Sequence, residues 1–110
     1  MFCFEKASIS SVELQELLGH EEKVQLLDVR EADEFNFCKI SGSFNISLSV
    51  LMQNFEKLDQ TLPIVTICHH GIRSQRAVNL LKEYGFTHVA SLEGGVDQWA
   101  KEIDSSMSRY

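Results

Sequence analysis

A cysteine followed by a short polar loop is the feature of this chain most able to do chemistry. Cys68 follows the apolar run 64–67 directly, and residues 74–84 after the loop have helical periodicity. At the end of a buried strand, just before a helix N-terminus, backbone N–H groups and the helix dipole stabilise negative charge. We therefore expect the Cys68 thiol to ionise easily and to act as a nucleophile. The alternative is a structural thiol, because free cysteines are often simply buried.

The elements that must position this cysteine follow from the spacing of apolar residues. Strands are expected within 4–9 and at 24–29, 43–46, 64–67 and 88–92. Helices are expected from Ser10 or Ser11 to Gly19, and at 32–37, 48–58, 74–84 and 96–103. Strands that alternate with helices predict an α/β fold with a mainly parallel sheet covered on both faces. Ligands bind such sheets beyond the carboxyl ends of the strands, where Cys68 lies.

Length, charge and cysteine usage narrow the class of protein. A chain of 110 residues is expected to form a single domain over 1–110, with a core of about 5–103 and a flexible tail at 104–110. The net charge of −6 argues against nucleic-acid or anionic-membrane partners. Cys3, Cys38 and Cys68, without a signal peptide or an apolar run of membrane-spanning length, indicate free thiols and a cytoplasmic location.

The spacing from Cys68 to Arg73 is Cys-x4-Arg. Protein tyrosine phosphatases and related arsenate reductases use Cys-x5-Arg, in which the longer loop cradles a tetrahedral oxyanion. One residue fewer makes a tighter ring of amides, which suits a single sulfur atom on the cysteine.

Four segments occur in an order and spacing that resemble the rhodanese-like (sulfurtransferase) family. Asp28-Val29-Arg30-Glu31 with Glu34-Phe35 resembles the signature "DVRE..EF/Y". Cys68–Ser74 resembles the loop "CxxGxRS", and Leu92–Val96 with Trp99 resembles "L.GG...W". Residues 40–43 match the segment "HIPGA" imperfectly, because Lys39 replaces its histidine and Ser41 its proline; Ser47 replaces a second proline further on. Loss of both prolines should loosen this loop.

The resemblance implies a single-domain, five-stranded α/β fold and sulfur transfer through a persulfide on Cys68. The donor would be a small molecule such as thiosulfate, and the acceptor a thiol or cyanide, possibly a protein thiol. No metal and no other cofactor is implied. The alternative is a relay or sensing module that presents sulfur to a protein partner with little free turnover. A phosphatase or arsenate reductase is a third reading.

The candidate site residues share one loop and the strand end expected beside it. Cys68 is the catalytic residue; the remaining loop residues are His69, His70, Gly71, Ile72, Arg73 and Ser74, and the supporting residues are Asp28, Arg30 and Glu31.

Arg73 could attract an anionic donor, or it could brace the loop by pairing with Asp28 or Glu31, which we favour. The adjacent side chains of His69 and His70 should splay apart, which makes a metal site improbable. They should instead form a polar rim of the loop or face solvent.

The remaining expectations concern packing and turns. Gly71 should supply a backbone conformation closed to other residues, and Ser74 should cap the following helix. If buried, Asp28 must be paired. Gly94-Gly95 should form a tight connection rather than an anion cradle, and Trp99 should lie in the core. Cys38 could be a resolving thiol, although an incidental role is favoured, as it is for Cys3.

Overall fold

The computed structural model describes residues 4, 6–20 and 23–110, so Cys3 lies outside the described residues. Five strands form one sheet in the order β1-β5-β4-β2-β3, and every neighbouring pair is parallel. The strands are β1 (Ser8–Ile9), β2 (Gln25–Asp28), β3 (Phe44–Asn45), β4 (Ile64–Ile67) and β5 (Val89–Leu92). The helices are α1 (Ser11–Gly19), α2 (Ala32–Phe37), η1 (Leu48–Lys57), α3 (Ile72–Glu83) and α4 (Gly95–Glu102).

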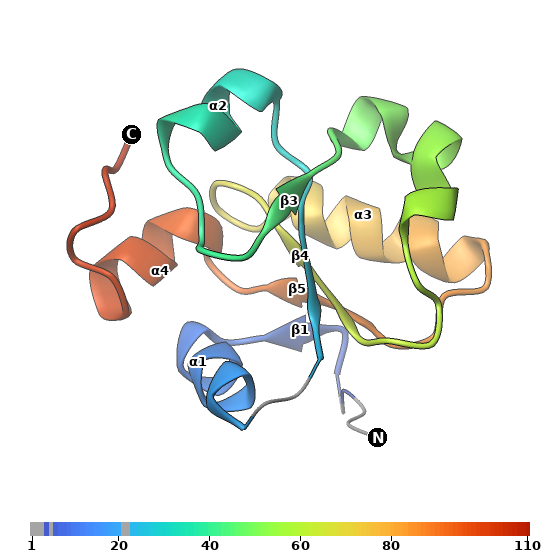
Figure 1. Ribbon diagram of the computed structural model, residues 1–110, viewed down its shortest axis with the longest axis horizontal. Coiled ribbons are helices and arrows are strands. Elements are labelled where there is room, and N and C mark those ends of the chain that lie inside the picture. Colours follow the sequence, from blue (N-terminus) through green and yellow to red (C-terminus); the bar gives the residue numbers. More distant parts are fainter. Residues whose placement is uncertain (1–3, 5, 21–22) are drawn as a thin grey trace.

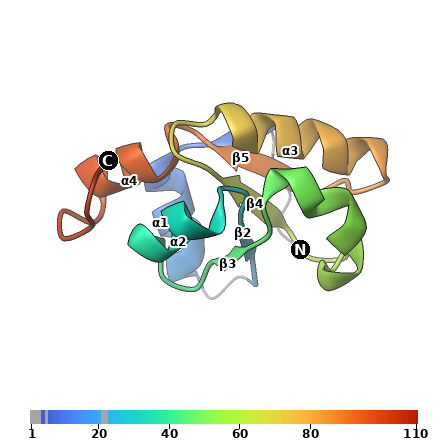
Figure 2. The ribbon, with the colours of Figure 1, turned by 90° about the horizontal axis from the view of Figure 1, so that it is seen from above.

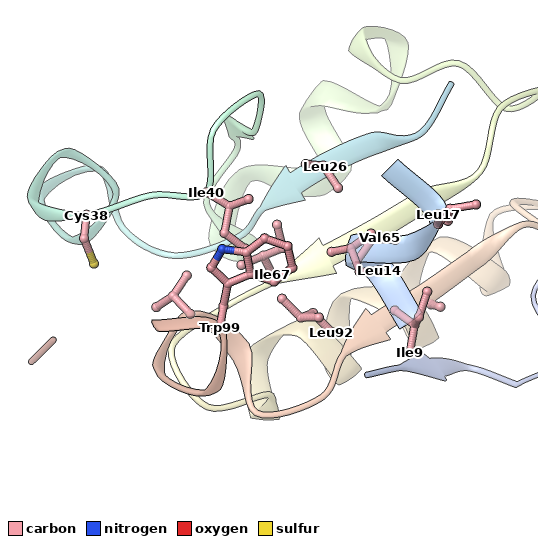
Figure 3. Packing of buried hydrophobic residues seen from close by; sticks show 12 residues of the cluster. Ile9, Leu14, Leu17, Leu26, Cys38, Ile40, Val65, Ile67, Leu92 and Trp99 are labelled. Carbon is pink, nitrogen blue, oxygen red and sulfur yellow. The ribbon is translucent and has the colours of Figure 1, made fainter. Parts of the chain in front are cut away.

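Helices cover both faces of the sheet, as expected from the alternating pattern (Figure 1; Figure 2). On one face, α1 and α4 contribute to a core cluster that includes Leu14, Leu17 and Trp99. Figure 3 shows Trp99 beside Ile67 in this cluster, so its expected place in the core is confirmed. On the other face, α3 and η1 form a second cluster, which contains Cys68.

Local sequence signals account for most element boundaries. Ser10 caps α1 through a reciprocal capping box, in which Ser10 Oγ accepts from the Glu13 N–H and Glu13 Oε1 accepts from the Ser10 N–H. The strand β4 consists of four buried residues, as a central strand covered on both faces requires. The bounds expected for α2 and β4 are confirmed.

Two helices differ most from the expectation. α3 begins at Ile72 rather than Ser74, because Gly71, with φ of 113°, serves as its N-cap. The expected cap role of Ser74 is therefore wrong, and Ser74 lies buried inside the first turn. The segment 48–57 is a 3-10 helix with a break at Asn54, not a regular α-helix, although it still buries Leu51 against the sheet.

The segment 104–110, expected to be flexible, folds back against the rest of the chain. Met107 packs against the cluster on the α1/α4 face, and Arg109 pairs with Asp97 of α4 at 2.9 Å. Tyr110 reaches α2, where its hydroxyl donates to Glu34. In the described residues, none of the helices has the length and apolar character needed to cross a membrane.

Candidate active site

Cys68 lies immediately after β4, and its side chain is enclosed by the loop that follows. The residue is only 1% exposed. The Gly71 N–H donates to Cys68 Sγ at 3.0 Å, and Ser74 Oγ lies 3.4 Å from the same sulfur. Gly71 itself has a positive φ of 113°, a conformation that other residues rarely adopt. Hydrogen bonds of this kind stabilise a sulfur that carries negative charge.

The N-terminus of α4 holds the same loop from the other side. The N–H groups of Val96 and Asp97 donate to the carbonyl oxygens of Cys68 and His69, at 2.9 and 3.2 Å. A Cβ atom at Gly95 would collide with both of these carbonyl oxygens, so the close approach requires glycine. Gly94-Gly95 thus forms a tight connection that grips the loop backbone.

Arg73 is paired with a carboxylate, but its partner is Glu34 rather than the expected Asp28 or Glu31. Its two terminal nitrogens donate to the two carboxylate oxygens of Glu34 at 2.7 and 2.8 Å. This planar, two-pronged contact joins the first turn of α3 to α2. The hydrogen bonds from Arg73 are the main cause of a pKa of about 2 for Glu34, against an ordinary value of 4.5.

Asp28 and Arg30 form a separate, fully buried ion pair with Arg30 Nη2 2.7 Å from Asp28 Oδ2. Asp28 is therefore buried and paired, as expected. Arg30 also donates to the carbonyl oxygens of Cys38 and Glu34, at 2.6 and 3.2 Å. Each guanidinium nitrogen thus has a partner, and the pair fixes the path of the chain from β2 through α2. Glu31 is exposed, and its N–H donates to Glu34 at the start of α2.

The two loop histidines do not splay apart, so that expectation is wrong. Their ring centroids lie 3.9 Å apart, and Tyr110 stacks on the far side of His69 at 3.9 Å with an interplanar angle of 9°. Burial, followed by the neighbouring His70, lowers the pKa of His69 below its ordinary 6.5. His69 is therefore a neutral, half-buried wall at neutral pH, whereas the side chain of His70 is 61% exposed.

Three further sequence expectations concern a metal site, the role of Cys38 and the position of Ile72. Within the described ranges, no group of three or more His, Cys, Asp or Glu side chains could hold a metal ion. Cys38 belongs to the α1/α4-face cluster, whereas Cys68 belongs to the α3/η1-face cluster. Cys38 Sγ instead lies 3.8 Å from Arg30 Nη1. Ile72 is 70% exposed at the end of the loop.

Three residues that contact the loop after Cys68 were not among the candidates taken from the sequence. Glu34 was visible in the signature "DVRE..EF/Y" but was not assigned as the partner of Arg73. Tyr110 carried no signal, because only the folded tail brings it to His69. Ser91 Oγ lies 2.6 Å from Ser74 Oγ, and an apolar strand with one small polar residue gave no reason to single it out.

Taken together, these contacts enclose the sulfur of Cys68 and give it hydrogen-bonding partners. The loop supplies an N–H and a hydroxyl to the sulfur, while the guanidinium group of Arg73 is held by the carboxylate of Glu34. Such contacts can stabilise an anionic sulfur.

Comparison with known proteins agrees with the fold. The model of the family described as "Rhodanese-like domain" matches residues 10–102. The chain therefore belongs to the rhodanese-like domain family.

Relatives at the sequence level include two kinds of protein. Thiosulfate sulfurtransferase GlpE of Shewanella oneidensis is 41% identical to this chain, over 69% of this chain and 75% of the GlpE protein. The adenylyltransferase and sulfurtransferase MOCS3-1 of Zea mays is 37% identical over 96% of this chain. The chain spans only 24% of that maize protein.

Solved structures show the same fold. A rhodanese-related protein from Thermoplasma volcanium matches with a TM-score of 0.80 and 34% identity, over 89% of this chain and 94% of its own. A rhodanese-like domain protein from Staphylococcus aureus matches with a TM-score of 0.82 and 25% identity, over 96% and 99% of the two chains.

Proposed function

We propose that the protein is a sulfurtransferase that moves a sulfane sulfur through a persulfide on Cys68. The observation that carries this proposal is the enclosure of Cys68 Sγ by the Gly71 N–H at 3.0 Å and the Ser74 hydroxyl at 3.4 Å. The names of relatives such as the Shewanella thiosulfate sulfurtransferase support the same reaction class. Thiosulfate is the proposed donor, and cyanide or a thiol is the proposed acceptor.

The reaction proceeds in two balanced steps. The Cys68 thiolate attacks the outer sulfur of thiosulfate, a new S–S bond forms, and the S–S bond of thiosulfate breaks with its electron pair leaving on sulfite. Cys68 then carries a persulfide with one negative charge. Cyanide or a thiolate attacks the terminal sulfur, which leaves as thiocyanate or as a new persulfide and returns the Cys68 thiolate.

The cationic side chains around the loop are already paired with carboxylates. We therefore propose that uncharged hydrogen-bond donors stabilise most of the negative charge on the Cys68 persulfide. Arg73 is neutralised by Glu34, and Arg30 is neutralised by Asp28 in the interior. His69 adds no fixed charge at neutral pH, because burial lowers its pKa. Stabilisation of the persulfide therefore falls to groups such as the Gly71 N–H, which act as an oxyanion hole does for developing negative charge.

A second candidate is a relay module that hands the sulfur to a protein thiol with little free turnover. Ile72 favours it, because a large apolar side chain that is 70% exposed beside the reactive loop is suited to a protein surface. The maize relatives, whose name joins adenylyltransferase with sulfurtransferase, also fit a relay within a larger assembly. In that case thiocyanate formation would be slow even though Cys68 still loads with sulfur.

Thiocyanate formation from thiosulfate and cyanide tests the proposal. Wild type is expected to be active, Cys68→Ser inactive, and Cys38→Ser close to wild type. Thiocyanate formation by Cys68→Ser at the wild-type rate would contradict the mechanism. An assay with an aryl phosphate tests the phosphatase alternative. The loop is expected to be too small for a phosphoryl group, so we expect no hydrolysis above background. Hydrolysis that depends on Cys68 would replace the sulfurtransferase proposal with a phosphatase.

A further inference from the structure

A short chain of hydroxyl groups lies behind Cys68 and ends in the interior of the sheet. Ser74 Oγ is 3.4 Å from Cys68 Sγ and 2.6 Å from Ser91 Oγ. Ser91 belongs to β5 and is only 3% exposed, so bulk water does not reach its hydroxyl freely. The two serines come from different elements, α3 and β5, and meet only in the folded chain.

The direction of the bond between the two serines follows from the requirement that buried hydrogens be paired. Among the described residues, Ser91 Oγ has one hydrogen-bonding neighbour, Ser74 Oγ. If Ser74 donated to Ser91, the hydrogen of Ser91 would be left buried without an acceptor, which is costly. Ser91 must therefore donate, and Ser74 must accept.

This assignment leaves the single hydrogen of Ser74 for one of two other neighbours. They are the carbonyl oxygen of Gly71, at 3.1 Å, and Cys68 Sγ. While Cys68 is a thiol, its hydrogen points to Ser74, and Ser74 donates to Gly71. Once Cys68 has lost its proton, Ser74 can turn its hydrogen to the sulfur. Gly71 still accepts from the Gln75 N–H at 3.1 Å, so this rotation leaves no carbonyl unpaired.

From these contacts we propose that Ser91 is a positioning residue for the nucleophile. Its hydroxyl fixes Ser74 as an acceptor on one side, so that Ser74 presents its hydrogen to the anionic sulfur on the other. Donation from Ser91 also polarises the Ser74 O–H group, which strengthens the hydrogen bond that Ser74 donates to a charged acceptor. The backbone of Ser74 is held as well, because Thr66 Oγ1 donates to its carbonyl oxygen at 2.8 Å. This inference deepens the proposed function and rests on Cys68 as its nucleophile.

The test measures alkylation of Cys68 by iodoacetamide as a function of pH, with peptide mass spectrometry to follow this thiol separately from the others. Ser91→Ala is expected to move the midpoint of the rate–pH curve to higher pH. Below the wild-type midpoint, the rate should fall about two- to fivefold, as expected for loss of one supporting neutral hydrogen bond. Ser91→Thr keeps the hydroxyl and should return the curve toward wild type.

Ser11→Ala provides the matched control. Ser11 is also a buried serine, 1% exposed, but its hydroxyl has no partner among the described residues and it lies in α1. Its curve should match wild type. A wild-type curve for Ser91→Ala, or an equal change in Ser11→Ala, would overturn the proposal. Alkylation needs no sulfur donor, so this outcome is independent of whether thiosulfate is the substrate.

Discussion

Arg73 and Glu34 form a two-pronged ion pair that joins the loop after Cys68 to α2, with nitrogen–oxygen distances of 2.7 and 2.8 Å. Glu34 also accepts from the hydroxyl of Tyr110 at 2.9 Å and from the Glu31 N–H at 3.0 Å. One carboxylate therefore connects the loop, the start of α2 and the folded tail. This arrangement favours the brace role expected for Arg73 from the sequence, but through a different partner.

Removing the brace should lower stability and activity together. Arg73→Lys keeps the charge but cannot reproduce the planar pair of hydrogen bonds. Because the pair is partly exposed, we expect a loss of about 0.5–1.5 kcal/mol in unfolding free energy. Melting curves and thiocyanate assays check this result. Lower activity with an unchanged melting temperature and a raised KM for thiosulfate would instead assign Arg73 to donor binding.

The same pair should make stability depend on pH in a defined direction. Glu34 has a pKa of about 2 in the folded protein, against an ordinary value of 4.5. Because its folded pKa is depressed, its contribution is fully present above 4.5 and is lost as pH falls toward 2. Urea unfolding of wild type and Glu34→Gln should therefore differ at neutral pH and converge across this window.

Asp33→Asn is the control for the pH experiment. Asp33 lies in the same first turn of α2 and is exposed, so its replacement removes the same charge without breaking the pair with Arg73. The Asp33→Asn variant should lose only the modest contribution that this charge makes to stability through the helix dipole. A difference between wild type and Glu34→Gln that stays constant down to strongly acidic pH would contradict the role given to this carboxylate.

Gly95 is expected to tolerate no side chain. An added Cβ would meet the carbonyl oxygens of Cys68 and His69, and φ at this position is +57°. Gly95→Ala should cost about 2–5 kcal/mol in unfolding free energy, because steric overlap adds to backbone strain. Differential scanning calorimetry measures the loss, and activity should fall with it.

The matched control is Gly19→Ala at the end of α1, where an added Cβ would have nothing within 4 Å. Its melting temperature should be unchanged or higher, since alanine favours the helix. Equal melting temperatures for the two alanine variants would mean that the loop can shift to accept the methyl group.

The sequence predicted those features that depend on neighbouring residues. β4 and α2 have the expected bounds because apolar runs and helix signals are local. The start of α3 was misjudged, since Ser74 has the chemistry of a cap while Gly71 takes the position by its backbone conformation. The break at Asn54 was also missed, because the apolar spacing of 48–58 is the same for a continuous helix.

The parts of the site that escaped prediction depend on contacts between distant segments. Several carboxylates could have reached Arg73, and only the position of α2 selects Glu34. Tyr110, at the end of the described chain, stacks on His69 only because the tail folds back. Ser91 meets Ser74 because α3 packs against β5. Each depends on the tertiary fold rather than on residue type or spacing.

The central claim is that Cys68 carries the transferred sulfur, and intact-mass spectrometry tests it most directly. After incubation with thiosulfate and removal of the excess, the wild-type protein should gain the mass of one sulfur atom. Peptide mapping should place it on Cys68, and cyanide should remove it. Cys68→Ser should remain unmodified. An unmodified wild-type protein, or an added sulfur that persists in Cys68→Ser, would contradict the account.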